Sequence, residues 1–299
     1  MVHQHSYKTK NYNRAFAIGV ILNLVFVFVE GGFGLFADSV ALIADAGHNL
    51  SDVLSLLLAW GATILAGQGT SRLRTYGLKK MTIMASLASA VLLCVTLGGI
   101  AWEAFGRLQN PQPVAGVTII LVAGIGTVVN TLTALLFMSG QKHDLNLRGA
   151  FLHMANDAGI SLGVVVSGCL ILVTGWLLID PLVSLLIVLV VLYSTWGLLR
   201  DSLNLAVDSV PRHIDMDGIV AYFDSLENVV HFHDLHVWPL STTEVALTVH
   251  LSVSSPELRP GFLSDIQTAL QERFDIAHST IQVEVEGDES CLLTPGDCC

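Results

Sequence analysis

The stretch that decides the fold is residues 44–60, "ADAGHNLSDVLSLLLAW", an apolar run that carries His48 and Asp52. A second apolar run, "FLHMANDAGISLGVVVSG", carries His153 and Asp157. In both runs the spacing is four, which places the imidazole and the carboxylate on one face of a helix. Ionisable residues at membrane depth are costly, and they mark functional sites by default. The two pairs therefore indicate a polar site between two membrane helices.

Composition divides the chain into two parts. Only 13% of its 299 residues are charged, against about 25% in soluble domains. Residues 1–207 carry 11 basic and 9 acidic residues, whereas residues 208–299 carry 3 and 16, a formal charge of −13. We expect a transmembrane domain over 1–207 and a water-exposed domain over 208–299. The acidic domain repels phosphate, which excludes nucleic acid as a partner, and it favours cations.

Six apolar segments are long enough for a helix to cross a hydrocarbon core of about 30 Å. They are residues 15–36, 40–66, 80–105, 114–138, 149–175 and 180–200. With a cytoplasmic N-terminus, ten Lys and Arg residues lie at the cytoplasmic ends, Lys79 and Lys80 among them, and only Arg107 at the outer ends. This bias predicts a six-helix transmembrane bundle with both termini in the cytoplasm.

The acidic tail has the pattern of a small α+β domain. Helices are expected over residues 215–226 and 261–274, and strands over 229–240, 243–253 and 280–286. The second strand alternates, with Val245, Leu247, Val249, Leu251 and Val253 on one face. The order α-β-β-α-β predicts a ferredoxin-like sandwich with helices on one face of a sheet.

The two His–Asp pairs lie near the middle of their spans. The second and fifth spans run in opposite directions, so packing them together would bring two imidazoles and two carboxylates to one place. Such a set suits tetrahedral Zn²⁺, whereas Mg²⁺ and Ca²⁺ prefer oxygen ligands. Chemistry alone leaves Co²⁺, Cd²⁺, Fe²⁺ and Ni²⁺ open. Each pair taken singly could be a structural hydrogen bond, but two pairs with the same spacing favour a metal site.

A metal held by these ligands is displaced by protons, because binding needs a neutral imidazole and an ionised carboxylate. A site exposed to each side of the membrane in turn would exchange Zn²⁺ for H⁺. Asp45 shares the face of His48 and could relay protons, orient His48, or be a solvated pore-lining carboxylate. Glu30 could line the cation path or bind helices together.

The segments "DSVALIADAGHNLSDVLSLLLAW", "LHMANDAGISLGVVVSG", "DPLVSLLI" and "HDLHVWPLSTTEVALTVHL" resemble those of the cation diffusion facilitator family, in its zinc-transporting branch. The resemblance covers essentially the whole chain. It implies a homodimeric antiporter that exports Zn²⁺ from the cytoplasm in exchange for H⁺, with the ion at His48, Asp52, His153 and Asp157. The short loop "SGQKHD" resembles bacterial members, which implies a multi-pass protein of a bacterial inner membrane, surrounded by lipid.

The resemblance also implies regulatory zinc in the tail domain. His233, His250 and Glu284 align with positions that bind metal there, and Cys291 and Cys298 resemble a Cys-rich tail that joins such sites. A single surface His is more often solvated than bound to metal. We therefore rest this prediction on the density of His residues beside acidic ones.

Other functions are less well supported by the sequence. An intramembrane metalloenzyme would need an open coordination position and a base, as in H-E-x-x-H. The chain lacks that motif and its predicted site is already four-coordinate, so we do not expect an enzyme. The remaining alternative is a membrane-bound sensor or scaffold that binds zinc without moving it, and a flux measurement decides between the two. Selectivity among Zn²⁺, Cd²⁺ and Co²⁺ stays open.

Overall fold

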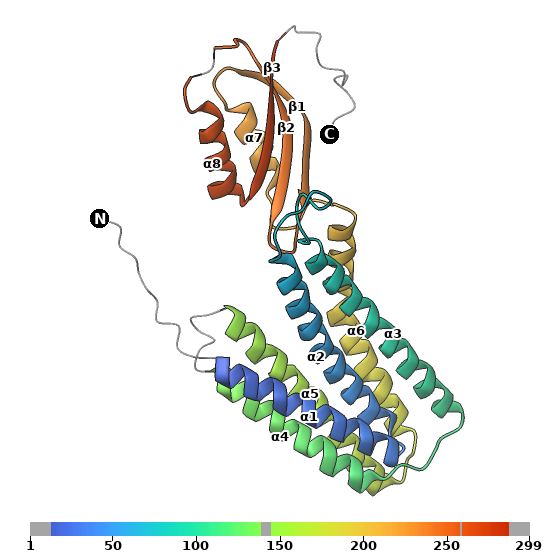
Figure 1. Cartoon of the computed structure of the whole chain (residues 1–299). Helices are drawn as coiled ribbons and strands as arrows, with labels where there is room; N and C mark the ends of the chain where they lie inside the picture. Colours follow the sequence, from blue (N-terminus) through green and yellow to red (C-terminus); the bar gives the residue numbers. More distant parts are fainter. Residues whose placement is uncertain (1–12, 139–144, 258, 287–299) are drawn as a thin grey trace. The chain divides into compact units, whose positions relative to one another are not determined.

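The computed structural model describes residues 13–138, 145–257 and 259–286 (Figure 1). Six long helices come first along the chain and a small mixed domain follows. The helices are α1 Asn13–Phe36, α2 Val40–Ala66, α3 Met81–Gln109, α4 Gly116–Met138, α5 Leu145–Thr174 and α6 Ile179–Ala206. Two compact units are present: Met1–Leu57 with Ser89–Gly197, and Leu58–Ala88 with Leu198–Cys299.

The helices have the length and composition that the apolar segments predict. Within the described residues, α2 to α6 each contain a stretch long and apolar enough to cross a membrane, and the corresponding part of α1 is Leu24–Phe36. The sixth helix is longer than expected, because no helix breaker follows residue 200. It ends at Ala206, and Asp208 then adopts a left-handed backbone with φ of 60°.

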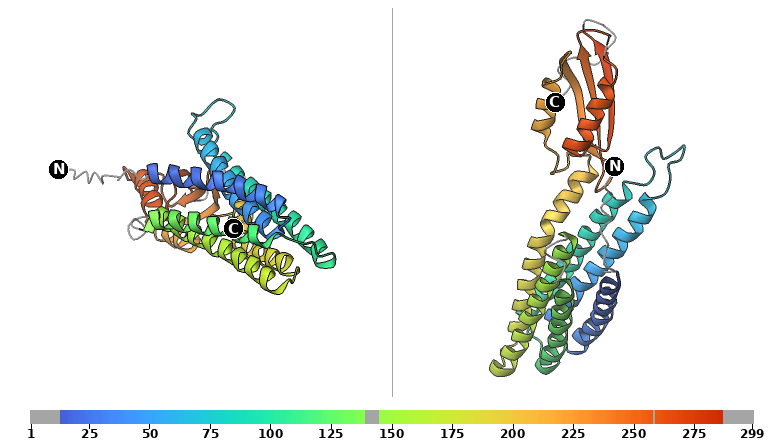
Figure 2. Two further views of the ribbon diagram at one scale, coloured as in Figure 1. Left: turned by 90° about the horizontal axis from the view of Figure 1, so that it is seen from below. Right: turned by 90° about the vertical axis from the view of Figure 1, so that its left-hand side faces the viewer.

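In the first unit, small residues bring α4 and α5 close together, and α1 lies against α4 (Figures 1 and 2). A Cβ atom at Gly168 of α5 would lie 2.9 Å from Ile120 Cγ1 of α4, so only glycine fits there. Small residues at such contacts let membrane helices approach closely. The contact holds α5, which carries Asp157, at a defined distance from α4.

The start of α2 is tied to α6 by a buried carboxylate. Asp180 is fully buried, and its side chain accepts hydrogen bonds from the Val40 amide, at 2.9 Å, and from the Ser39 hydroxyl. The first amides of a helix lack partners within the helix, so a side-chain acceptor there stabilises the helix end. Because this acceptor belongs to α6, it also positions α2, the helix that carries His48.

The C-terminal domain lies within the second unit. It consists of α7 Met216–Asp224, β1 Val229–Pro239, β2 Val245–Val253, α8 Phe262–Phe274 and β3 His278–Val285. The sheet order is β1-β2-β3, with β1 antiparallel and β3 parallel to β2. Both helices cover the same face of this sheet (Figure 1). The expected α-β-β-α-β order is confirmed.

The core of this domain follows the predicted alternation of β2. Leu247, Val249 and Leu251 have no exposed surface and pack with Ile266 and Leu270 of α8. Because successive strand residues point to opposite faces, the residues between them lie on the face that the helices leave open. His250 is one of these residues, so the apolar core orients the polar cluster described next.

Candidate metal centre

His48 of α2 lies between two carboxylates in the first unit. Its Nδ1 atom is 3.6 Å from Oδ2 of Asp52, one helical turn further along α2. Its Nε2 atom is 3.3 Å from Oδ1 of Asp157, which α5 supplies. His48 and Asp157 are buried, and Asp52 is partly exposed. The predicted contact between the second and fifth helices is therefore present at these three residues.

The separations fit a metal site. With bonds of about 2.0 Å in a tetrahedral zinc site, neighbouring ligand atoms lie about 3.3 Å apart. His48, Asp52 and Asp157 each offer one ligand atom, and these atoms all lie within 4.8 Å of one another. An imidazole gives a metal one nitrogen, and a carboxylate at the other nitrogen orients the ring. A carboxylate lies at each ring nitrogen of His48, so whichever nitrogen binds the ion, all three residues still offer one ligand atom each.

His153 is the fourth predicted ligand. It belongs to α5 and comes one turn before Asp157. Its side chain lies outside the described residues, so its place at the cluster stays a prediction.

A hollow of about 460 Å³ adjoins the cluster in the first unit. Besides His48 and Asp157, it is lined by four residues of α5 and six of α6. They are Asn156, Gly159, Ile160, Gly163, Val183, Leu186, Ile187, Val190, Val191 and Ser194. The small residues of α5 leave room beside the ligands, which gives an ion space to approach them.

On α2, Asp45 lies in a separate polar group. Its Oδ2 atom accepts a hydrogen bond from Ser161 Oγ at 2.6 Å, and its Oδ1 atom accepts one from Asn49 Nδ2 at 3.4 Å. The same Asn49 amide donates to Oε2 of Glu30 on α1, also at 3.4 Å. Sequence reasoning left the role of Glu30 open. The signal that singled it out was an acidic residue in the middle of an apolar span.

The second predicted cluster lies in the C-terminal domain, on the sheet face opposite the helices. Nδ1 of His250 is 2.9 Å from Oε1 of Glu284, and Nε2 of His233 is 3.4 Å from Oε2 of the same carboxylate. The three residues offer ligand atoms that all lie within 4.8 Å of one another. All three side chains are partly buried. They form a candidate metal site built from one residue of each strand.

Strand register explains how these residues meet. His233 of β1 pairs directly with His250 of β2, so both point to the same face. Glu284 of β3 pairs with Ser252, two residues beyond His250 on that face. The ladder hydrogen bonds of three strands therefore fix the separation of the ligands.

Sequence reasoning missed Asp234 as a member of this group. It lies at an irregularity in the pairing between His233 and His236, with φ of 52°. Its carboxylate is 2.8 Å from Nε2 of His236 and 3.5 Å from Nε2 of His250. The only signal in the sequence is an Asp within "HDLH". Cys291 and Cys298, the other predicted ligands, lie outside the described residues.

The two lysines before α3 each pair with an acidic residue. Within the second unit, Lys80 pairs with Asp208 at 2.7 Å, and Lys79 pairs with Glu244 in the turn between β1 and β2. From the sequence we favoured plain positive-inside anchors at these positions, with Asp201 or Asp208 of a second copy as alternative partners. Both pairs join residues of one chain, so the segment before α3 is connected to the C-terminal domain.

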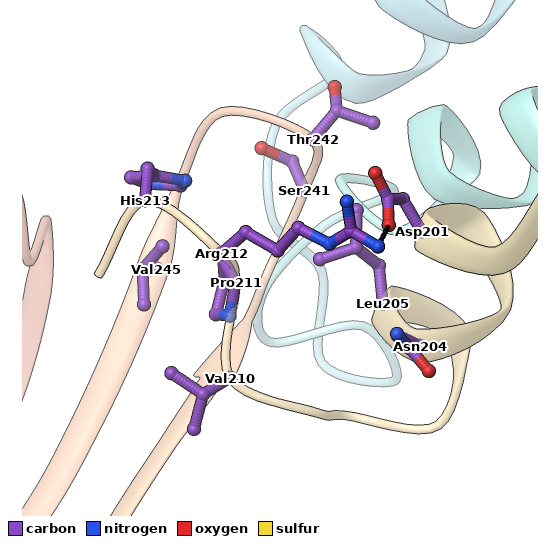
Figure 3. Close-up of a pocket in the computed structure, with 10 residues that line it drawn as sticks. All are labelled: Asp201, Asn204, Leu205, Val210, Pro211, Arg212, His213, Ser241, Thr242 and Val245. Carbon is purple, nitrogen blue, oxygen red and sulfur yellow. Dashed lines mark ion pairs between the residues drawn. The ribbon is translucent and has the colours of Figure 1, made fainter. Parts of the chain in front are cut away.

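A second hollow, of about 190 Å³, lies where α6 leads into the C-terminal domain (Figure 3). Arg212 reaches Asp201 of α6 there at 2.7 Å, beside Ser241 and Thr242 of the β1–β2 turn. Because its cation is paired with a carboxylate of the same hollow, the arrangement joins the end of α6 to the domain. Among the described residues, the two clusters that could hold a metal ion contain no residue of this hollow.

Comparison with protein families gives two matches. The cation efflux transmembrane domain matches residues 16–205, and the cation efflux protein cytoplasmic domain matches residues 211–286. The chain belongs to the cation efflux family. The family is one of transporters, and the apolar helices make this member an integral, multi-pass membrane protein.

Three relatives show how far the similarity extends. The metal cation efflux system protein CzcD of Cupriavidus metallidurans is 34% identical, over 95% of this chain and 90% of its own length. The zinc transporter ZitB of Escherichia coli is 34% identical, over 96% and 93%. The cadmium, cobalt and zinc/H(+)-K(+) antiporter of Bacillus subtilis is 32% identical, over 97% and 96%.

Proposed function

We propose that this cation efflux protein exports Zn²⁺ from the cytoplasm in exchange for H⁺. The ion binds to His48, Asp52, His153 and Asp157, and the site opens to each side of the membrane in turn. The observation that carries this proposal is His48 between two carboxylates, inside helices suited to a membrane. Buried ionisable residues of this kind belong to ion pathways rather than to packing.

Charge explains why protons are the exchanged ion. The negative charges of two carboxylates neutralise the charge of a divalent cation, and neutral imidazoles add no charge. When the cation leaves, the same oxygen and nitrogen atoms take up protons. Two uncompensated negative charges are then not left buried between the helices. A high proton concentration on the outer side would therefore expel the metal there.

The names of the relatives agree with this choice of ion. ZitB is named as a zinc transporter, and the Bacillus subtilis relative is named for cadmium, cobalt and zinc and as an H(+)-K(+) antiporter. Tetrahedral nitrogen and oxygen ligands also accept Cd²⁺ and Co²⁺, so we propose these ions as competing substrates.

For the C-terminal domain we propose dimer formation and regulatory zinc binding. It begins near residue 208, lies in the cytoplasm of a bacterial cell beside the inner membrane, and pairs with a second copy. His233, His250 and Glu284 hold the regulatory ion, and Cys291 and Cys298 complete the site. Their chemistry is that of the transport ligands, with one residue from each of three strands.

The test uses purified protein in vesicles that contain a pH-sensitive dye. Addition of Zn²⁺ should move protons across the wild-type membrane, and Asp157→Asn should abolish this flux. Glu103→Gln is the matched control, because Glu103 is an exposed carboxylate on α3 whose partner Arg107 keeps its contact with Asp38. Zinc entry without proton movement would contradict the exchange.

The same vesicles decide the remaining alternative. A sensor or scaffold would bind zinc, because both clusters offer ligands, but it would move neither zinc nor protons. Wild-type protein that binds zinc and gives no flux would therefore replace the transporter proposal with the sensor proposal.

A further inference from the structure

A second set of buried carboxyl groups lies beside the metal cluster in the first unit. Glu30 of α1 and Asp45 of α2 both have no exposed surface. The amide of Asn49 donates to both carboxyl groups at 3.4 Å, and Ser161 Oγ donates to Asp45 at 2.6 Å. A single amide nitrogen therefore joins the two carboxyl groups, which places them side by side.

Ionised carboxylates have only acceptor atoms, and the Asn49 amide and the Ser161 hydroxyl are neutral donors, so they would leave two negative charges side by side. Oε1 of Glu30 is buried and receives no N–H or O–H donor in the described part of the chain. Two adjacent carboxylates in a low-dielectric interior cannot both be ionised, and they share a proton instead. The geometry therefore indicates a pair that holds one proton when the metal site is empty.

Among the described residues, the helix that packs against α1 supplies no cation that could replace this proton. α4, which packs against α1, contains no ionisable side chain. The charged groups that act on Asp45 are Glu30, His48 of α2 and Asp157 of α5. His48 and Asp157 are metal ligands, so the charge that the pair experiences changes when metal binds.

We propose that Glu30 and Asp45 form a proton-binding pair, separate from the metal ligands, that releases its proton when a divalent cation enters the His48 site. This inference rests on the proposed exchange of zinc for protons. The arriving cation adds positive charge within electrostatic range of Asp45, which favours the doubly ionised pair. The proton leaves to water, and when the cation departs the pair takes up a proton again.

The first test measures protons released when Zn²⁺ is added to the full-length protein in detergent at low buffer strength. Glu30→Gln should release about one proton less per chain than wild type, because the pair titrates as a unit. The new amide can donate to Asp45, which then stays ionised in both states. Glu30→Asp should restore the release, and Glu103→Gln, at an exposed carboxylate, should match wild type.

Glu30→Gln combined with Asp45→Asn should lose no more than the single variant, since the exchanged proton belongs to the pair. Protons released at the C-terminal cluster are the same in all variants, so they cancel in the difference. Equal proton release by Glu30→Gln and wild type would overturn the proposal.

Infrared difference spectra give a readout that a purely structural role would not change. Zinc should remove the C=O band of a protonated carboxyl group in wild type, and Glu30→Gln should lack this change. A band that persists with zinc bound would overturn the proposal. Proton release that requires K⁺, and is lost when choline replaces K⁺ in the buffer, would overturn it as well. In that case the oxygen cluster binds a monovalent cation.

The carboxyl-pair proposal and the transporter proposal can fail separately. Wild-type vesicles without zinc flux refute the transporter proposal, whereas proton release in detergent still tests the pair. If Glu30→Gln vesicles move zinc with a lower proton-to-metal ratio, both proposals stand. If they keep the wild-type ratio, only the carboxyl pair is refuted.

Discussion

Replacement of Glu284 by Gln tests the C-terminal cluster most sharply. Each oxygen of the Glu284 carboxylate faces a different imidazole, with separations of 2.9 Å to His250 and 3.4 Å to His233. Gln keeps the shape of the side chain, but it removes the negative charge and one of the two acceptor oxygens. The two imidazoles would then have no anionic ligand from β3 with which to balance a divalent cation.

The size of the expected loss in zinc affinity follows from the burial of the Glu284 carboxylate. Its side chain is only 10% exposed, and removal of one charged partner from a buried group costs about 3–5 kcal/mol. At about 1.4 kcal/mol per tenfold change, the zinc affinity of the cluster should fall by a factor of roughly 10² to 10⁴. His250→Ala should give a loss of similar size, and the double variant little more, because both remove the same site.

The assay is competition for Zn²⁺ against a chelating dye, with full-length protein in detergent. All variants carry Asp157→Asn, so that the transmembrane cluster contributes little to the signal. Glu272→Gln, at an exposed carboxylate of α8 in the same domain, is the control and should bind as tightly as its parent. If Glu284→Gln also binds with parental affinity, His233, His250 and Glu284 are not a metal site.

Three further predictions concern packing and ion pairs. Gly126→Ala places a Cβ 2.5 Å from the Phe26 ring. Such overpacking should lower the free energy of unfolding by about 1–3 kcal/mol. The Tm in detergent should fall, and Phe26→Leu should partly restore it. Lys80→Ala should change the free energy of unfolding by about 0–1 kcal/mol, because its pair with Asp208 is half exposed; a larger loss would show a structural role. Leu247→Ala should cost about 2–5 kcal/mol at a fully buried position, and unchanged denaturant unfolding would contradict that core.

Local periodicity made much of the fold predictable. The four-residue spacing of His48 and Asp52 places both on one face of α2 whatever surrounds the helix, because helix geometry is set by neighbouring residues. Alternation along β2 likewise assigned His250 to the polar face of its strand, and the register with β1 agrees. Features that depend on one helix or one strand could therefore be read from the residues alone.

Features that depend on packing between distant segments could not be predicted in this way. Asp180 caps α2 from 140 residues away, and no local pattern specifies that contact. Glu30 meets Asp45 only because α1 packs against α2 at one particular rotation. Asp234 turns toward His250 because the strand is irregular there and its φ is positive, a conformation that Asp adopts more often than most residues but does not require.

The origin of the ligands distinguishes the two candidate metal sites. His48 and Asp157 come from separate helices, and side-chain packing rather than backbone hydrogen bonding sets their separation. His233, His250 and Glu284 come from three strands whose ladder hydrogen bonds fix their spacing. A small shift of one helix would separate the first set, which suits the release of an ion in the proposed alternating access. The second set keeps its geometry unless the sheet unfolds, so it suits an ion that is retained and sensed rather than one that is passed on.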